Sequence, residues 1–240
     1  MNQQTKGIVL KQLKYSESSI IIRVYTLDFG VQSYLVRGVR KKKSKNHSTL
    51  FQPLSLIDLT SFTYKNNDLN LFQEGKNFHL FKNLYSDPVK INISFFLSEL
   101  LASVLKEEIP DLDLFYYITE SLQILDGEEQ NYANFHLWFM LHLTQFLGFY
   151  PNTDQFNAPY FNLMEGNFTF VKSVYTCSEE DSIFIKKFLK LTINQSLALK
   201  FNKQNRQNIL DILIKYYNLQ NHDISNLKSL KILKEIFDIL

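Results

Sequence analysis

Near residue 80 the spacing of apolar side chains changes, and this change constrains the fold more than any other feature of the chain. Before that point, short runs rich in Val, Ile, Tyr and Phe are separated by turn residues, which is typical of β-strands. After it, apolar residues recur at the three- and four-residue spacing of amphipathic helices. We therefore expect a multi-module α+β protein, with strands in residues 1–80 and helices in residues 81–240.

The first part of the chain predicts a small β-barrel. Leu27-Asp28-Phe29-Gly30 supplies turn chemistry between two strand-like runs, which makes these two runs a hairpin. Five short strands in about 75 residues fit a closed barrel, because closure leaves no free edge. An open five-stranded sheet is the alternative. The strands are expected at residues 7–10, 19–26, 31–36, 54–63 and 69–73.

The second part predicts an all-α domain. Asp87-Pro88 marks a helix start, because proline is tolerated in a first helical turn. Residues 132–147 are apolar on nearly all sides, which indicates a centrally buried helix, and Gly148 is a helix stop. The remaining helices are expected at residues 89–108, 112–125, 179–192, 206–219 and 226–239, with Pro110-Asp111 separating the first two.

Residues 149–177 interrupt the helical pattern. Proline and asparagine residues mark a loop, and two short strand-like runs flank Glu165-Gly166, which predicts a small hairpin inserted in the helical domain. Ser178, followed three residues later by Asp181, resembles a capping box that starts the next helix.

The net charge of +2 hides a strong segregation along the chain. Residues 1–80 carry 12 Lys and Arg against 5 Asp and Glu, residues 81–185 carry 4 against 15, and residues 186–240 carry 10 against 4. Segregated charge of this kind favours a surface that binds a polyanion.

Residues for catalysis or metal binding are scarce. Cys177 is the only cysteine, which excludes an intramolecular disulfide and a zinc cage built from cysteines. His136 and His142 are six residues apart, not at the i, i+4 spacing of a helical zinc site. Neither a nucleophile elbow nor a phosphate-binding or dinucleotide-binding glycine motif is present. We therefore expect no enzyme, no metal site and no cofactor.

Nothing in the sequence predicts a membrane protein. The longest unbroken apolar run, Leu137–Leu141, has five residues, against roughly 20 needed to cross a bilayer. The first residues lack the basic and apolar regions of a secretory signal. We expect a soluble protein of the cytoplasm.

The most informative segment is Arg37–Lys45, which holds six cations in nine residues. Like charges this dense are unsuited to internal packing, so the segment is expected in a loop, with Gly38 permitting a bend. If all six cations contacted phosphates, log K against log[salt] would have a slope of about −4 on single strands. A solvated loop that aids solubility and a targeting signal are the alternatives. The predicted phosphate contacts are Arg37, Arg40, Lys41, Lys42, Lys43 and Lys45, with Lys11 and Lys14 as weaker candidates.

Aromatic residues of the strand region are candidates for stacking on unpaired bases, because stacking tolerates any base. We expect half or more of them to lie in the core. They are Tyr25, Phe29, Tyr34, Phe62, Tyr64 and Phe72.

Three separated parts of the chain resemble one family, the bacterial recombination and repair mediator RecO. The first comprises Gly7–Leu10, Tyr15–Ser19, Thr26–Gly30, Arg37–Lys41 and Gln52–Leu54. The second is Leu147–Pro151, and the third comprises Tyr216-Tyr217, Leu227–Ser229 and Leu233. No single motif is decisive, but together they span nearly the whole chain.

The resemblance implies an N-terminal oligonucleotide-binding (OB) barrel, residues 1–80, packed on a helical domain, residues 81–240. Many RecO proteins carry four zinc-binding cysteines in the loop after the Gly-Phe-x-Pro segment. This chain has no cysteine from Asp154 to Thr176, so residues 155–176 replace the metal module with a hairpin, and any zinc-dependent role is in doubt.

The resemblance also implies a non-enzymatic role in DNA repair and recombination, in the bacterial cytoplasm at the nucleoid. RecO-like proteins bind single- and double-stranded DNA and anneal complementary strands. They engage the tail of single-strand-binding protein and, with RecR, help RecA to displace that protein from DNA. An OB-fold RNA-binding protein and a protein–protein scaffold that never touches nucleic acid are the alternatives.

The basic C-terminal part offers a second candidate site. A charged rim around a hydrophobic groove suits the acidic, apolar-ended tail of single-strand-binding protein. Solvated helix faces are the alternative for each of these cations. The candidates are Lys186, Lys187, Lys190, Lys200, Lys203 and Arg206.

Overall fold

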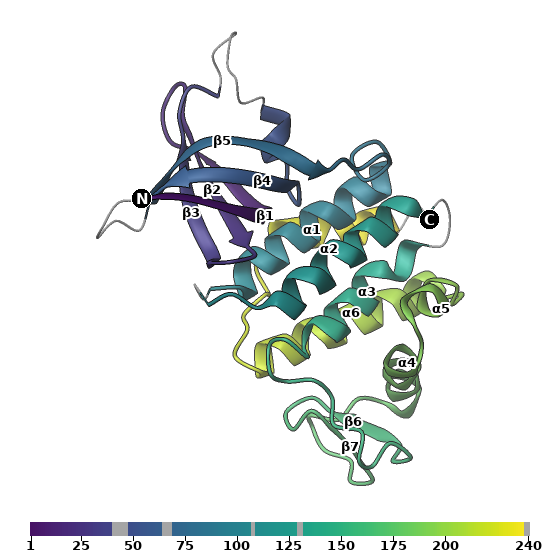
Figure 1. Ribbon diagram of the computed structural model, residues 1–240. Helices are drawn as coiled ribbons and strands as arrows, with labels where there is room; N and C mark the ends of the chain where they lie inside the picture. The colour runs from purple at the N-terminus through teal and green to yellow at the C-terminus, as the bar shows by residue number, and fades with distance from the viewer. Residues whose placement is uncertain (40–47, 64–68, 107–108, 129–131, 238–240) are drawn as a thin grey trace. The chain divides into compact units, whose positions relative to one another are not determined.

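The structure of the chain is a computed structural model (Figure 1). It describes the whole chain except residues 40–47, 64–68, 107–108, 129–131 and 238–240, and the side chains of residues 236–237. The described residues form two compact units, Met1–Gly127 and Glu128–Leu240. The compact units do not coincide with the predicted division at residue 80, and that division into domains stays a prediction.

The first unit contains the predicted five-stranded barrel (Figure 1). Its strands close in the order β1-β2-β3-β5-β4, with β4 paired to β1, so the barrel is closed and the alternative of an open sheet is excluded. All neighbours are antiparallel except β3 and β5. The strands are β1 (Asn2–Lys14), β2 (Ile20–Thr26), β3 (Gly30–Val36), β4 (Leu56–Phe62) and β5 (Leu69–His79).

Strand β1 is far longer than the run predicted at residues 7–10. Its first half pairs with β4, from Asn2 opposite Phe62 onwards, and its second half pairs with β2. The register between β1 and β2 shifts between Val9 and Lys11, which bends the strand so that it can serve both neighbours. Barrel closure, and not local β-propensity, therefore sets the length of this strand.

The barrel interior is filled by apolar side chains from all five strands. They are joined by Val39, which follows β3, and by two residues of a short 3₁₀ helix, Ser48–Phe51. The Phe51 and Phe72 rings meet edge to face, with their centroids 5.2 Å apart. A barrel of this size is closed by its own side chains and leaves no channel.

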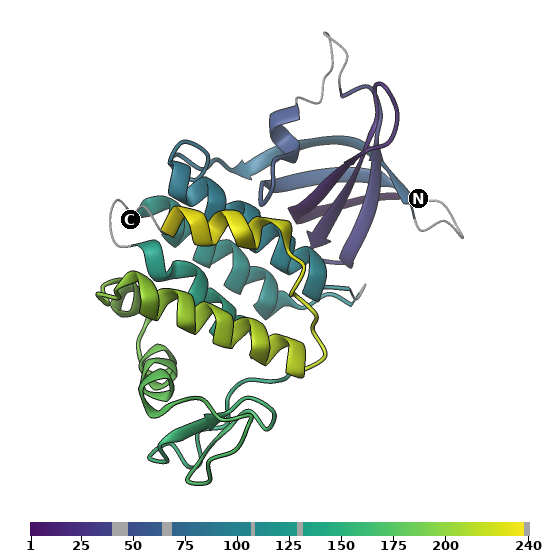
Figure 2. The ribbon, with the colours of Figure 1, turned by 180° about the vertical axis from the view of Figure 1, so that it is seen from behind.

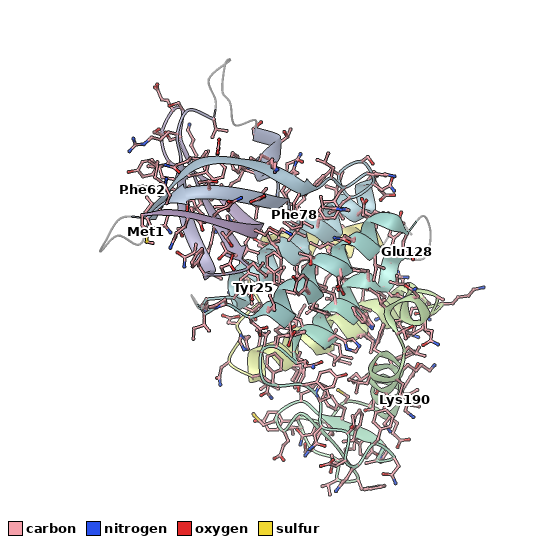
Figure 3. The ribbon with its side chains drawn as sticks, viewed as in Figure 1. Met1, Tyr25, Phe62, Phe78, Glu128 and Lys190 are labelled. Atoms are coloured by element: carbon pink, nitrogen blue, oxygen red, sulfur yellow. The ribbon has the colours of Figure 1, made fainter. Side chains whose placement is uncertain are left out.

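Two helices belong to the first unit, α1 (Pro88–Val104) and α2 (Leu112–Gly127). Asp87 caps α1 as its N-cap residue, with Pro88 at the start of the helix, as predicted. Strand β1 packs on α1, where the Ser98 hydroxyl donates to the Leu10 carbonyl. Figure 3 shows Tyr25 on the barrel, and its hydroxyl donates to the carbonyl of Asp111 at 3.0 Å.

The second unit is mainly helical, as predicted for this part of the chain. Helix α3 is shorter than the predicted 132–147 and is preceded by a 3₁₀ turn, Tyr132–Asn134. Helix α5 was not predicted, although Thr192 and Gln195 form a capping box at its start. Figure 2 shows α7 turning back after α6, and an ion pair joins Lys234 of α7 to Asp211 of α6. The helices are α3 (Phe135–Leu143), α4 (Glu179–Lys190), α5 (Ile193–Leu197), α6 (Lys203–Leu219) and α7 (Lys228–Phe237).

The predicted hairpin is present as β6 (Tyr160–Asn162) and β7 (Asn167–Thr169). Phe161 and Phe168 are buried between the two strands and neighbouring aromatic rings. The following helix, α4, begins after Ser178, whose hydroxyl oxygen accepts the backbone N–H of Asp181, as the capping pattern predicted.

Candidate nucleic-acid interface

Most of the predicted cationic segment lies outside the described residues: Arg40, Lys41, Lys42, Lys43 and Lys45. The residues that flank it are described. Val39 on one side and Leu50 on the other both belong to the buried core of the barrel. Gly38 has a φ of +72°, which is the backbone bend expected at this position. The described residues before and after the segment therefore belong to the barrel core.

The three remaining predicted contacts are described, and all are exposed. Arg37 directly follows β3. Lys11 and Lys14 lie in the second half of β1, where they pair with Arg23 and Ile20 of β2. Arg37 follows Val36, the partner of Ile20, so the three cations belong to neighbouring strands.

Between these cations runs a row of apolar side chains that the sequence did not reveal. Direct register pairs link the row across all five strands. The row points outward, because Ile20, Ile22, Tyr34 and Val36, which alternate with its members, belong to the barrel core. The row runs around the closed barrel, so its members on β1, β2 and β3 face a different side from those on β5 and β4. We call the part on β1, β2 and β3 the barrel wall; it consists of Leu13, Ile21 and Leu35, and the row continues through Leu71 and Phe62.

The loop between β1 and β2 borders the barrel wall and carries an exposed aromatic residue. Tyr15, two residues beyond Leu13, is 62% exposed. Its backbone N–H donates to the carbonyl of Ser19 at 3.1 Å, and the Ser16 hydroxyl oxygen accepts the N–H of Ser19 at 3.2 Å, so the loop is held closed. In OB barrels this loop and the outer face of strands 2 and 3 form the oligonucleotide-binding side. Tyr15 is thus placed to offer a ring to an unstacked base.

The aromatic residues that the sequence offered for stacking are mostly unavailable. Tyr25, Tyr34 and Phe72 are buried in the first unit, in line with the expectation that half or more belong to the core. Burial, followed by the charge of Asp111, raises the pKa of Tyr25 to about 12. Phe29 and Phe62 are half-buried, and Tyr64 lies outside the described residues. The stacking candidate is therefore Tyr15, which lies in the loop after β1 and not among the strand aromatic residues.

Arg23 lies on the outer side of β2, and its side chain binds α1 and not the barrel wall. Its guanidinium donates to the carbonyl of Ala102 at 3.2 Å and to that of Leu105 at 2.9 Å, both at the C-terminal end of α1. A cation there also complements the negative end of the helix dipole. Of the barrel cations, Arg23 is thus committed to an internal contact, whereas Lys11, Lys14 and Arg37 face solvent.

In the second unit, two of the predicted partner-binding lysines contact the hairpin. The Lys186 ammonium donates to the Ala158 carbonyl at 2.6 Å and lies 5.1 Å from the centroid of the Phe168 ring. Burial, followed by the charge of Lys190, lowers the pKa of Lys186. Lys190 lies 4.5 Å from the centroid of the Phe156 ring. Both lysines thus help to hold the hairpin on α4.

The other candidates divide into exposed cations and one buried arginine. Phe184 and Phe201 are half-buried and pack edge to face at 4.9 Å, and Lys187 lies 5.4 Å from the Phe184 centroid. Lys200, next to Phe201, and Lys203 are exposed. These residues form an aromatic pair with cations beside it.

Arg206 does not fit the expected exposed rim. It is buried, and its guanidinium donates to the Asn134 side chain at 3.2 Å and to the Phe201 carbonyl at 3.4 Å. We therefore correct this prediction: a guanidinium that is removed from solvent and bonded to two carbonyl oxygens holds α6 in place.

His136 and His142 lie in packed surroundings in the second unit. His136 is fully buried, and burial, followed by the charge of Arg206, lowers its pKa to about 3, so the ring is neutral near pH 7. His142 contacts the Phe188 carbonyl at 3.1 Å.

Among the described residues, no three His, Cys, Asp or Glu side chains are grouped to hold a metal ion. In the same residues no helix is both long and apolar enough to span a bilayer.

Two of the motifs that carried the family resemblance meet in the core of the second unit. The Phe149 ring packs edge to face against the rings of Tyr216 and Tyr217, at 5.3 and 5.1 Å. The Tyr216 hydroxyl donates to the Phe149 carbonyl, and the Tyr217 hydroxyl donates to the Met140 carbonyl at 2.7 Å. These motifs are therefore structural.

Comparisons with known proteins match nearly the whole chain. Residues 1–81 match the family model described as "Recombination protein O N terminal", and residues 85–231 match "Recombination protein O C terminal". A "DNA repair protein RecO" of Azobacteroides pseudotrichonymphae genomovar. CFP2 is 36% identical over 99% of this chain and 100% of its own length. Proteins of the same name from Bacteroides fragilis strain YCH46 and Flavobacterium johnsoniae strain UW101 are 37% and 35% identical, with the same coverage of both chains.

Proposed function

The chain belongs to the RecO family, and from that premise we propose that it is a non-enzymatic mediator of DNA repair and homologous recombination. In this proposal it binds single- and double-stranded DNA and anneals complementary strands. With RecR, it helps RecA to load onto DNA that is coated by single-strand-binding protein. The site of action is the bacterial cytoplasm, at the nucleoid.

The observation that carries the proposal is the basic border of the barrel wall. Lys11, Lys14 and Arg37 are exposed around it, and the other five predicted contacts lie outside the described residues, between Val39 and Leu50 of the barrel core. Cations arranged along one side of a barrel can neutralise phosphates of two strands at once, which lowers the repulsion that opposes annealing. Such contacts carry no sequence information, so annealing works for any pair of complementary strands.

In this proposal, Tyr15 and the barrel wall contact the bases and sugars of single-stranded DNA. A single exposed ring beside an aliphatic surface can stack on a base of single-stranded DNA, and the sugars can pack against the aliphatic groups. Duplex DNA offers no unstacked base, so it is bound through phosphates alone. We therefore expect single-stranded DNA to gain from Tyr15 and double-stranded DNA not to.

We further propose that the tail of single-strand-binding protein binds at Phe184 and Phe201. Lys187, Lys200 and Lys203 lie on or next to this aromatic pair, which suits an acidic peptide with an apolar end. A peptide with the sequence of that tail should bind the chain, and Phe184→Ala should weaken binding, whereas Phe95→Ala, an exposed position on α1, should not. Equal binding by both variants would remove this site.

The main test is annealing of complementary DNA coated with single-strand-binding protein, with and without RecR. A variant with Arg40, Lys41, Lys42 and Lys43 changed to Glu should lose annealing, and its single-strand salt slope should fall from about −4 to about −1. A control variant carries the same charge change at four exposed lysines, Lys106, Lys215, Lys228 and Lys231. It should retain annealing and the single-strand salt slope of the wild type.

The outcomes separate the alternatives. Unchanged affinity and slope in the first variant would remove the phosphate contacts and favour a protein scaffold. Equal or stronger competition by RNA of the same sequence would favour an RNA-binding protein. Failure of the intact protein to anneal coated strands, with DNA binding retained, would contradict the mediator role.

A further inference from the structure

The second unit carries an exposed apolar surface that none of the roles above uses. It combines Met164, in the turn between β6 and β7, with residues just after β7, where the chain passes from the hairpin towards α4. Exposed apolar groups gathered in one place on a globular protein usually mark an interaction site. We call this surface the hairpin tip; it consists of Met164, Phe170, Val171, Val174 and Tyr175, which are 42, 61, 71, 82 and 39% exposed.

Hydrogen bonds hold the backbone of the hairpin tip. The backbone N–H of Val171 donates to the Thr169 hydroxyl at 3.1 Å, and that of Ser173 donates to the Thr176 hydroxyl at 3.0 Å. The Tyr175 carbonyl accepts the N–H of Leu163 at 3.0 Å, which ties the tip to the end of β6. With its backbone held in this way, the tip keeps its apolar side chains in solvent, so little conformational entropy is lost when they dock.

Three carboxylates neighbour the hairpin tip along the chain. Glu165 is exposed and directly follows Met164. Glu179, at the start of α4, accepts a hydrogen bond from the Tyr160 hydroxyl at 3.1 Å, and Glu180 follows it. One cation, Lys172, lies on the tip itself, 6.0 Å from the centroid of the Tyr160 ring. The excess of negative charge disfavours nucleic acid and anionic membranes as occupants and favours an apolar surface bordered by cations.

A surface of that kind is present on the same chain. The barrel wall is apolar, and Lys11, Lys14 and Arg37 border it, with Glu17 as one opposing carboxylate in the neighbouring loop. We propose that the hairpin tip of one copy docks on the barrel wall of a second copy. Apolar side chains then meet across the contact, and the carboxylates around the tip face the cations around the wall.

This contact is head to tail, because its two sides are different surfaces. Each copy keeps a free tip or a free wall after one contact forms, so further copies can add. The tip exposes only five apolar side chains, so the contact falls below the roughly 1,200 Å² of a stable interface and is transient. Its ionic part weakens as salt rises. Self-association is therefore expected in the micromolar to millimolar range and at low ionic strength.

The contact uses the same barrel wall as the DNA strand proposed above, so the two occupants compete. This consequence rests on the proposed function, whereas the self-association does not. A protein that self-associates but binds no DNA would contradict only the proposed function, and one that anneals DNA but stays monomeric would contradict only the present inference.

The experiment is sedimentation equilibrium of the full chain, without DNA, over a range of concentrations and at two salt concentrations. The weight-average mass should rise with protein concentration at low salt and less so at high salt. A tip variant, Val171→Ser with Val174→Ser, and a wall variant, Leu13→Thr with Leu35→Thr, should each stay monomeric. Threonine is chosen for the wall because it suits strands. Circular dichroism and thermal melting check that both variants are folded.

Mixing the two variants gives the decisive result. The tip variant retains a wall and the wall variant retains a tip, so an equimolar mixture should form dimers that grow no further. If the wall variant is unfolded, Lys11→Glu with Lys14→Glu replaces it, since both side chains are exposed. The control Ile232→Ser removes another exposed apolar side chain, on α7, and should associate normally. A monomeric wild type, an associating tip variant or a mixture that fails to dimerise would each overturn the proposal.

Discussion

Asp126 and Leu84 are joined across 42 residues of chain: the Asp126 Oδ1 atom accepts the backbone N–H of Leu84 at 2.7 Å. The same carboxylate accepts the N–H of Asn83 at 2.7 Å and that of Lys82 at 3.0 Å. The buried ammonium of Lys90 donates to the Asp126 carbonyl at 3.0 Å. The end of α2 is thereby fixed to the connection between β5 and α1, which stabilises the first unit where the barrel ends.

We expect Asp126→Asn to destabilise the chain. An amide has one acceptor oxygen for the three N–H donors, and its NH₂ group opposes at least one of them. Leaving buried donors without a partner should lower the free energy of unfolding by about 1–3 kcal/mol. Urea denaturation near pH 7 measures this change. Asp113→Asn, at an exposed position in the first turn of α2, should change it by less than about 0.5 kcal/mol.

The effect of Asp126 should depend on pH. Burial acts to raise the pKa of this carboxyl, but the three N–H donors and Lys90 outweigh it and hold the pKa below its ordinary value of 3.8. A group whose folded pKa is depressed contributes stability that is fully present above the unfolded pKa and is lost as pH falls through the folded pKa. The difference between wild type and Asp126→Asn should therefore be constant above about pH 5 and shrink below it. A difference that grows as the solution is acidified would contradict this account.

Arg23 and Arg37 should respond in opposite ways to the same substitution. Arg23→Gln removes two hydrogen bonds from a charged donor to the end of α1, so the unfolding free energy should fall by about 1.5–3 kcal/mol with the DNA salt slope unchanged. Arg37→Gln should leave stability within about 0.5 kcal/mol and reduce the single-strand slope by about 0.7. Denaturation curves and binding titrations over a salt series measure both effects. A change of slope in the Arg23 variant would show that this guanidinium also meets phosphate.

Tyr15→Ala should weaken binding of single-stranded DNA selectively. The loss of one stacked base is worth about 1–3 kcal/mol, or roughly 5- to 150-fold in affinity. Binding of duplex DNA and the salt slope should not change, because no phosphate contact is removed. Fluorescence anisotropy with matched single- and double-stranded oligonucleotides gives the comparison. Tyr15→Phe should bind as wild type does, and Tyr116→Ala, at an exposed position on α2, serves as the control. Equal weakening for both DNA forms would argue against stacking.

Gly166→Ala should destabilise the hairpin. Gly166 has a φ of +63°, and a Cβ atom there would lie 2.7 Å from the Tyr216 hydroxyl. The side-chain strain in this backbone region costs about 1–2 kcal/mol, and displacing Tyr216 also weakens its bond to the Phe149 carbonyl. Thermal melting measures the loss. Gly127→Ala is the matched control, because its Cβ meets open space, and it should be neutral or slightly stabilising. A variant at Gly166 as stable as wild type would contradict the packing described.

Local sequence patterns were sufficient for the order and type of most elements. Turn residues and β-branched runs located β2 and β3 to within a residue, because their signals come from neighbouring positions. The N-caps Asp87 and Ser178 were predictable for the same reason, since a cap acts within its own turn. Helix α5 was not predicted, because its five residues are too few to show an apolar period, although Thr192 and Gln195 form a capping box at its start.

Long-range pairing explains what the sequence did not reveal in the candidate site. The barrel wall joins residues from three strands by register, and no local pattern marks Leu13, Ile21 and Leu35 as neighbours along one row. Arg206 and Lys187 look alike in sequence, yet packing of α6 buries the first and leaves the second exposed. The predicted phosphate contacts of the cationic segment lie outside the described residues, so they stay predictions.

The amino-acid sequence alone determined that strands precede helices, that a dense cationic segment follows the third strand, and that the chain resembles RecO proteins. These properties depend on residue type and on spacing over a few positions. Only the tertiary structure decided which cations are free to meet a phosphate and which are used to hold helices. The reason is that burial and hydrogen bonding depend on partners far apart in the chain. Arg23 donates hydrogen bonds to the end of α1, whereas Arg37 is exposed to solvent, with no such helix contact in the described residues.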